Sequence, residues 1–457
     1  MIKNNNQVQA LPVVYLPDGW TLSTLGEVST KPQYGWTTKA NHESGNVKLL
    51  RTTDITSGQI DWATVPYCSK EPDDLDKYLL EPGDIVVSRA GSVGVSYLIT
   101  DTDNAVFASY LIRFRPIEQV DKKYVYYYLK STNYWKAIGE NTLGIAVPNV
   151  NATKLAKIEI PIAPQDEQKR IVAEIEKQFS RLDEAVENLK RVKANLNRYK
   201  ASVLKAAVEG KLTEEWRKKH PDVEPADKLL ERILAERRKK WEEAELVKMK
   251  AKGKVPKDDN WKKKYKKPSK YDFNKLPLLP GGWEWASVEQ LAEIQLGKML
   301  DRQKHLKGNR LAYLRNINVR WGAINTDDLL EMFFKDTELN RYGLEAGDVL
   351  VCEGGEPGRA AVWDGSSPDM KYQKALHRVR FYRDYEEHLL VYYLEFLSQT
   401  GLLKRWFTGS TIKHFTKESF SGLPVPLPPK DEQVKIVSVT EEHLSNILVL
   451  ERDVDTN

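Results

Sequence analysis

The residue types that catalysis uses are present in this chain, but their spacing does not assemble them into a catalytic set. The seven histidines are scattered, and none lies at helical or hairpin spacing from another metal-ligating residue. No GxGxxG follows an expected strand, and no Walker loop is present. Cys68 and Cys352 lie far apart, without a Cys-x-x-Cys spacing. We therefore predict that this chain is not an enzyme and has no catalytic residue, metal site or cofactor.

Two short sequences come closer to a chemical motif than the rest of the chain. GGEPG at 354–358 has the glycine content of a phosphate-binding loop. It corresponds, however, to RAGSVG at 89–94 in an internal repeat, which favours a loop of the scaffold. Pro428-Pro429 is followed by Lys430 and not by an aromatic residue, so it lacks the Asn-Pro-Pro-aromatic pattern of amino-methyltransferases.

The elements that position these loops occur twice, at an offset of about 264 residues. Five landmarks recur in the same order. They are LPDGW (16–20) and LPGGW (279–283), KLLRTTDI (48–55) and AYLRNINV (312–319), LLEPGDIVVSRAGSVG (79–94) and GLEAGDVLVCEGGEPG (343–358), Gly144 and Gly409, and IPIAPQDEQKRIV (160–172) and VPLPPKDEQVKIV (425–437). We conclude that one unit is duplicated.

Each repeat has the pattern of an α+β domain of about 150 residues. Alternating apolar runs after a Gly-Asp turn predict strands at 84–88 and 348–352, and later apolar runs predict helices at 124–138 and 388–407. We place the first domain at 1–163 and the second at 276–429.

Each domain ends in prolines and leads into a heptad helix, at 164–210 and at 430–457. The central helix has no Gly or Pro between 165 and 209 and would be roughly 65 Å long. A long core helix of one domain is the alternative. The predicted seam comprises Ile171, Ile175, Leu182, Leu189, Val192, Leu196, Tyr199 and Val203 of the first helix and Ile436, Ile447 and Leu450 of the second.

The second helix is much shorter than the first, since 28 residues follow Pro429. We therefore expect pairing along about half of the central helix. We also expect the segment from about Leu189 to Ala206 to lack a partner within this chain.

Between the first helix and the second domain lies a charged segment, 211–275, without a counterpart in the repeat. We expect a helix at 226–252, followed by a basic, poorly ordered tether. Residues 237–270 hold 15 Lys and Arg against 5 Asp and Glu, an excess of 10 where the whole chain has +5. A solvated spacer is one interpretation. An arm that follows a phosphate backbone is the other, and Trp261 and Tyr265 would suit it.

The totals favour a multidomain protein of the cytoplasm. At 457 residues the chain is too long for one ordinary core, so two or three domains are expected. It has no apolar run of 18 residues and no signal-peptide pattern, which argues against a membrane partner and against export.

The landmarks and the closing Pro-x-x-Glu-Gln step into a heptad helix resemble the specificity subunits of type I restriction–modification enzymes. ASVLKAAVEGKLTEEWR (201–217) belongs to the same resemblance, which covers nearly the whole chain except the tether. The resemblance implies two target-recognition domains, each reading one half of a split, asymmetric site in double-stranded DNA. The two helices would form an antiparallel coiled coil that fixes the spacing of the half-sites.

The same resemblance implies partners and their cofactors. DNA adenine methyltransferase (M) subunits, which bind S-adenosylmethionine, would dock on the helices, and ATP- and Mg-dependent restriction (R) subunits would join through them. Base contacts would come from polar side chains on loops at matching places in the repeats. The candidates are Arg51, Thr53, Ser88, Arg89, Ser92 and Asn149 in the first domain and Arg315, Asn316, Glu353, Arg359, Lys413 and His414 in the second.

Two other interpretations remain open on the sequence. A coiled-coil adaptor that binds only proteins would show no salt-dependent affinity for DNA. A truncated specificity protein that no longer assembles would bind methyltransferase weakly.

Overall fold

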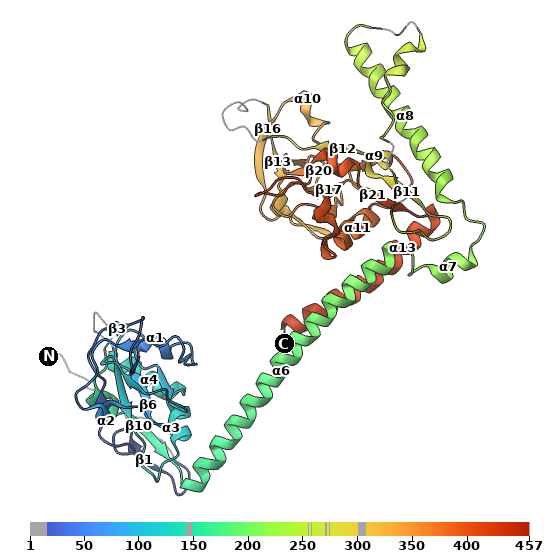
Figure 1. Ribbon diagram of the computed structural model, residues 1–457. Helices are drawn as coiled ribbons and strands as arrows, with labels where there is room; N and C mark the ends of the chain where they lie inside the picture. The colour runs from blue at the N-terminus through green and yellow to red at the C-terminus, as the bar shows by residue number, and fades with distance from the viewer. Residues whose placement is uncertain are drawn as a thin grey trace, which may run out of the picture. The chain divides into compact units, whose positions relative to one another are not determined.

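The computed structural model describes residues 16–142, 149–254, 256, 258–269, 272–273, 275–299 and 308–456, so Gly144 lies outside the described residues. The chain forms two compact units, Met1–Val186 and Glu187–Asn457. The boundary falls inside one continuous helix, α6 (Gln165–Val208) (Figure 1). The architecture is α+β, as expected. The proposed division into five segments stays a prediction.

Unit 1 contains two four-stranded sheets and a terminal strand pair. The first sheet has the order β2-β9-β6-β7 and the second the order β3-β5-β4-β8, in which β4 and β8 are parallel. The strands are β1 (Thr21–Thr24), β2 (Gln33–Tyr34), β3 (Ala40–Asn41), β4 (Lys48–Leu50), β5 (Tyr67–Cys68), β6 (Ile85–Ser88), β7 (Ser96–Leu98), β8 (Ala105–Phe107), β9 (Leu111–Phe114) and β10 (Glu159–Ile162). The helices are α1 (Thr52–Ile55), α2 (Leu75–Tyr78), α3 (Lys122–Tyr128), α4 (Thr132–Thr142) and α5 (Ala152–Ala156).

The domain of unit 2 repeats this arrangement, with the sheets β12-β20-β17-β18 and β16-β13-β19, in which β13 and β19 are parallel. Its strands are β11 (Glu284–Ser287), β12 (Ala292–Leu296), β13 (Asn309–Leu314), β14 (Val319–Arg320), β15 (Ala323–Ile324), β16 (Leu330–Phe334), β17 (Val349–Cys352), β18 (Ala360–Val362), β19 (Lys371–Tyr372), β20 (Leu376–Phe381) and β21 (Pro424–Leu427). The helices are α9 (Val288–Leu291), η2 (Asn316–Asn318), α10 (Asp336–Leu339), α11 (Glu387–Gln399), η3 (Leu402–Trp406) and α12 (Lys417–Ser421).

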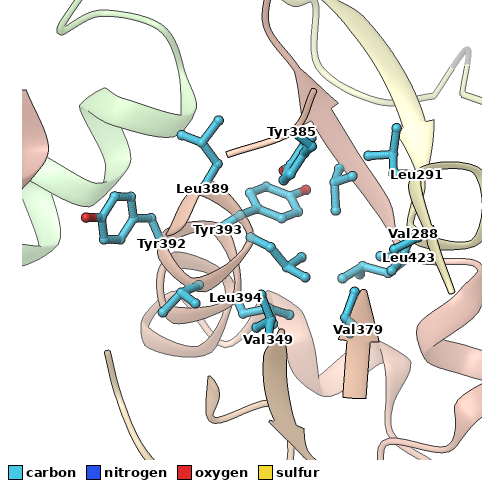
Figure 2. Packing of buried hydrophobic residues seen from close by; sticks show 14 of the residues in the cluster. Val288, Leu291, Val349, Val379, Tyr385, Leu389, Tyr392, Tyr393, Leu394 and Leu423 are labelled. Carbon is cyan, nitrogen blue, oxygen red and sulfur yellow. The ribbon is translucent and has the colours of Figure 1, made fainter. Parts of the chain in front are cut away.

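The central strand of each domain is buried on both faces because alternate side chains point to opposite sides of a sheet. In β17, Val349 and Val351 pack with α11, whereas Leu350 and Cys352 pack toward the second sheet. Figure 2 shows Leu394 of α11 beside Val349 and Val379. The domain therefore has a helix layer, a central sheet and a second sheet.

Two buried polar contacts show that the repeat extends to atomic detail. Asp84 pairs with Arg115 at 2.6 Å, and Asp348 pairs with Arg380 at 2.6 Å. Both carboxylates are almost fully buried, so each needs its cationic partner. The ion pair occupies the same place after the Gly-Asp turn in both domains.

The expected strands and helices are present, but each long expected helix is divided in two. Residues 124–138 fall in α3 and α4, because the Ser131 hydroxyl accepts a hydrogen bond from the Tyr134 amide and starts a new helix. Residues 388–407 fall in α11 and η3, which meet at Gly401 with a φ of 74°.

The expectation that Leu189 to Ala206 lacks a partner within the chain is wrong. Helix α13 (Lys430–Thr456) lies along the C-terminal half of α6 (Figure 1). Lys193 pairs with Asp455 at 2.8 Å, and the Tyr199 hydroxyl lies 2.9 Å from Nδ1 of His443. The two helices are antiparallel, and α13 starts where α6 ends. Helix α13 is therefore too short to cover the N-terminal half of α6, where Ile171 and Val172 pack against the first domain and the stretch around Leu182 stays uncovered.

The seam residues accordingly differ in burial. Leu196, Val203, Ile436 and Ile447 are buried, Ile171, Ile175 and Leu189 are half-buried, and Leu182, Val192, Tyr199 and Leu450 are exposed. Leu182 is 59 % exposed because it precedes the paired part of α6.

The segment after α6 is folded where the structure describes it, and the expectation of a poorly ordered tether is wrong for 258–269. It contains α7 (Glu214–Lys219), α8 (Ala226–Ala251) and η1 (Asp259–Lys264). The rings of Trp241 and Trp261 stack with centroids 6.0 Å apart, so η1 is held against α8. Trp261 and Tyr265 therefore form the interior of this segment and not an exposed aromatic surface.

Candidate nucleic-acid interface

In unit 1 the ends of β4 and β6 lie together. The fully buried Ser88, which ends β6, donates through its hydroxyl to the Ala90 carbonyl oxygen at 2.9 Å. The same hydroxyl lies 3.4 Å from that of Thr52, the first residue of α1. Because it is buried and hydrogen-bonded, Ser88 shapes the loop and does not present a surface for a ligand.

Arg89 connects this loop to a third segment. Its guanidinium donates to Oδ1 of Asn149 at 3.4 Å and lies 5.0 Å from the ring centroid of Tyr34. Ala90 and Asn149 also form an antiparallel bridge. The structure thus brings Arg89 and the exposed Asn149 side by side, with an aromatic ring beneath the cation.

The side chain of Arg51 is held within its own turn by Asp54. It donates to both carboxylate oxygens of Asp54, at 3.0 and 2.7 Å, and these hydrogen bonds raise the pKa of the guanidinium. Asp54 also accepts from the Arg51 amide at 2.7 Å, which closes the first turn of α1. Thr53 is exposed beside this pair, and Ser92 is half-buried in the 88–94 loop.

In unit 2 three loops meet around Asn316. Its side-chain amide donates to the Gly354 carbonyl oxygen at 3.2 Å, and its own carbonyl oxygen accepts from Arg359 at 2.8 Å. A Cβ placed on Gly354 would lie 3.4 Å from Nδ1 of His414. The structure therefore places Asn316, Glu353 to Arg359 and His414 around one surface.

The cations of this second cluster also have local partners. Arg315 pairs with Asp328 at 2.7 Å, and Arg359 pairs with Glu356 at 2.6 Å. Lys413 is exposed, and its ammonium donates to the Gly409 carbonyl oxygen at 2.6 Å. Binding a phosphate or a base edge would require these groups to exchange partners, which lowers the net gain from each contact.

The matching loops carry opposite charges at equivalent positions. Arg89 follows β6 directly, and the half-buried Glu353 follows β17 directly. Both loops fold in the same way, since the Gly94 amide donates to the Ser88 carbonyl oxygen at 2.8 Å and the Gly358 amide to the Cys352 carbonyl oxygen at 2.9 Å. The 354–358 glycines therefore belong to the scaffold, as the repeat predicted.

Exposed side chains beside the candidates were not predicted from the sequence. Tyr110 is 61 % exposed, and its carbonyl oxygen accepts from the Arg89 amide. In unit 2, Ile317 is 50 % and Ile412 67 % exposed on the loops that carry Asn316 and Lys413. Large apolar residues within otherwise polar loops are the sequence signal that marks these positions.

His377 lies beneath the second cluster. Its Nε2 is 2.7 Å from the Phe415 carbonyl oxygen, next to His414, and Nδ1 has no hydrogen-bond partner among the described residues. Burial lowers the pKa of His377 to about 4, so the ring is neutral at pH 7. It supports the 408–415 loop through a neutral hydrogen bond.

The family described as "Type I restriction modification DNA specificity domain" matches residues 17–198 and 280–452, which are the two repeats with their helices. The chain belongs to this family. Each specificity domain contains one of the two loop clusters, and each match continues into the helix that follows the domain. The chain is thus a type I restriction–modification specificity subunit with two DNA-recognition domains.

Relatives and solved structures agree with this assignment. The specificity subunit of the type I restriction enzyme EcoKI from Escherichia coli strain K12 is 23% identical over 96% of this chain and 85% of its own length. The EcoBI specificity subunit from Escherichia coli is 24% identical over 49% of each chain. The crystal structure of the HsdS subunit from Thermoanaerobacter tengcongensis has a TM-score of 0.56 at 17% identity, covering 97% of this chain and 93% of that one, and shares the fold.

Within the described part of this specificity subunit, no group of three or more His, Cys, Asp or Glu is arranged to hold a metal ion. No helix among the described residues is long and apolar enough to cross a membrane. Burial raises the pKa of the Cys352 thiol to about 11, so this side chain is a neutral core residue at pH 7.

Proposed function

We propose that this chain recognises a bipartite, asymmetric site in double-stranded DNA, one half through each specificity domain. The loop clusters support the proposal. They occupy the same place on two copies of one scaffold, but one presents Arg89 and Asn149 where the other presents Glu353, Asn316 and His414. Arginine favours guanine, asparagine favours adenine and a carboxylate accepts from cytosine N4, so the two clusters would select different bases.

Seven of the predicted DNA contacts fall into two groups by their exposure and partners. Asn149, Thr53 and Lys413 are exposed and are our first choice for contact with DNA. Ser88 is buried, and Arg51, Arg315 and Arg359 are held by carboxylates. The second group would fix loop shape and reach DNA only on exchanging partners.

We further propose that the chain acts without a catalytic step of its own. DNA adenine methyltransferase subunits would dock on α6 and carry S-adenosylmethionine, and restriction subunits would supply the ATP- and Mg-dependent steps. The exposed apolar side chains of Phe179, Leu182 and Val186 on the N-terminal half of α6 support a docking surface there.

The proposal is tested by mapping methylated adenines in cells with and without this chain. We expect a split sequence motif whose methylation disappears on deletion of the chain. Methylation that is unchanged by the deletion would refute the proposal.

A further inference from the structure

The segment that follows Arg237 forms a basic arm, which we define as residues 237–269. It consists of the outer part of α8 and the returning segment with η1, and Figure 1 shows it projecting from the domain of unit 2. The Arg237 guanidinium lies 5.3 Å from the ring centroid of Tyr265, which in turn meets Trp241 at 5.4 Å. These contacts, with the Trp241–Trp261 stack, hold helix α8 and the returning segment together.

The base of the arm is fixed to the second specificity domain. Leu229 and Ile233 of α8 are fully buried, and Arg237 donates through Nε to the Glu289 carbonyl oxygen at 3.1 Å. Lys240 donates to the Tyr382 carbonyl oxygen at 3.2 Å, directly after β20. The arm is therefore a built extension of the domain and not a solvated spacer.

Most acidic residues of the arm form ion pairs or hydrogen bonds with other residues of the arm. Glu242 pairs with Arg238 at 2.9 Å and with Lys262 at 3.8 Å, and Asp259 pairs with Lys262 at 3.1 Å. Asp258 accepts from the Asn260 amide at 3.0 Å. These internal contacts leave most of the lysines without a counter-charge.

The remaining lysines share two properties: they are exposed, and no ion pair holds them within the described part of the chain. They are Lys239, Lys240, Lys250, Lys252, Lys254, Lys263, Lys264, Lys266 and Lys267, of which Lys240 and Lys263 donate hydrogen bonds to the Tyr382 carbonyl oxygen and to Asn260. Concentrated positive charge of this kind attracts a polyanion, with an affinity that falls steeply with salt.

The chemistry of the arm favours a phosphate backbone over a protein surface. Protein interfaces have an apolar centre, yet Val247 is the only large hydrophobic side chain exposed among the described residues of the arm. Trp261 is buried, so this ring does not offer bases a stacking platform. A ligand held by lysine charge alone is bound without regard to sequence.

We propose that the basic arm is a second DNA-binding surface, which holds the phosphate backbone outside the half-site. One end of β20 is Leu376, which pairs with Cys352 beside the loop that carries Glu353. The other end is Phe381, next to Tyr382 and the arm. The arm and the loops thus occupy opposite ends of one sheet. This inference rests on the proposed function only in taking double-stranded DNA as the ligand.

The test uses the full chain and a random-sequence duplex. Lys250, Lys254, Lys264 and Lys267 are replaced by Gln together, and the matched control replaces the exposed Lys211, Lys218, Lys219 and Lys228, which lie before the arm. For the arm variant we expect at least a tenfold loss of affinity at about 0.1 M salt, and a slope of log affinity against log salt that is shallower by up to about 3.6, at about 0.9 per contact. The control should keep the slope of the unmodified chain.

Other outcomes separate this inference from the proposed function. Equal slopes for the arm variant and the control would overturn the arm as a DNA contact. Loss of bound methyltransferase with unchanged duplex affinity would assign the arm to an acidic protein surface and would also overturn it. The methylated motif should keep its sequence in cells that carry the arm variant. If the proposed function were wrong, methylation of the motif would not depend on the unmodified chain either.

Discussion

At the scale of residues, buried polar groups and not exposed ones determine the shape of the recognition loops. Ser88 with Thr52, and His377 with the Phe415 carbonyl oxygen, lie under the surface that would face DNA. Each is a partnered polar group in a low-dielectric interior, where an unpaired group would be costly. Loop geometry therefore depends on side chains that would never touch a base.

The neutral His377 predicts a pH dependence of the stability of the second domain. Its folded pKa of about 4 lies below its ordinary value of 6.5, so the unfolded chain binds the proton more tightly. The stabilisation is complete above pH 6.5 and is lost as the pH falls toward 4, by about 3 kcal/mol in total. Amide hydrogen exchange of β20 at a series of pH values would measure it.

A matched variant isolates the histidine from other acid effects. His377→Gln keeps a donor for the Phe415 carbonyl oxygen but does not titrate, so its β20 amides should lose less protection between pH 6.5 and 4. If both proteins lost protection in parallel, His377 would not be the cause.

At the scale of elements, an equivalent glutamine joins each of the helices α6 and α13 to the domain before it. Gln168 accepts from the Asp121 amide at 2.8 Å and donates to the Ala163 carbonyl oxygen at 2.8 Å. Gln433 accepts from the Glu386 amide at 2.9 Å and donates to the Pro428 carbonyl oxygen at 2.9 Å. The DEQ step thus ties the start of each long helix to the domain before it.

Replacing this glutamine by leucine should loosen one helix start at a time. Gln433→Leu leaves a buried amide and a buried carbonyl oxygen without partners, at a cost of about 2 kcal/mol. Gln168→Leu should have the same effect in unit 1 only. Hydrogen exchange of the first turns of α13 and α6 would report each, and the exposed Gln165→Leu provides the control. A loss no larger than that of the control would show that the glutamines are not structural ties.

The sequence predicted the elements better than their partners. Duplication, the strands at Gly-Asp turns and the extent of α6 follow from local pattern, because Gly, Pro and apolar spacing act over a few residues. The placement of α13 on the C-terminal half of α6 could not be obtained from heptad phase, which is the same for either half. Likewise, Trp241 lies 20 residues before Trp261 and 24 before Tyr265 in a lysine-rich chain, and only their contact in the folded arm shows that they pack together.

The sequence also predicted where the candidate site lies better than the role of each residue. The loops around Arg89 and Glu353 were found from the repeat. The commitment of Arg51 to Asp54 and of Arg315 to Asp328 depends on backbone turns that bring the carboxylates within 2.7 Å, which a residue type alone does not reveal.

At the scale of the whole molecule, one chain combines two recognition domains with helices that carry them. The uncovered part of α6 has Phe179 at 51 % and Leu182 at 59 % exposure, which is unusual for a surface otherwise rich in charge. Under the proposed assembly, a methyltransferase subunit would bury this face.

A single charge on that face should therefore weaken assembly without unfolding the chain. Leu182→Asp is expected to reduce the methyltransferase that co-purifies with the chain at least tenfold, since an unpaired carboxylate would be buried in the interface. Asn188→Asp introduces the same charge at another exposed position of α6 and should have little effect. Equal retention of methyltransferase by both variants would contradict the proposed docking surface.

The central claim is that each specificity domain reads its own half of a split DNA site. It is tested most directly by exchanging residues 10–163 for the corresponding domain of another specificity subunit and mapping methylated adenines in cells. The account predicts a new sequence in one half of the motif, with the other half and the spacing retained. A motif that is unchanged, or that changes in both halves, would contradict it.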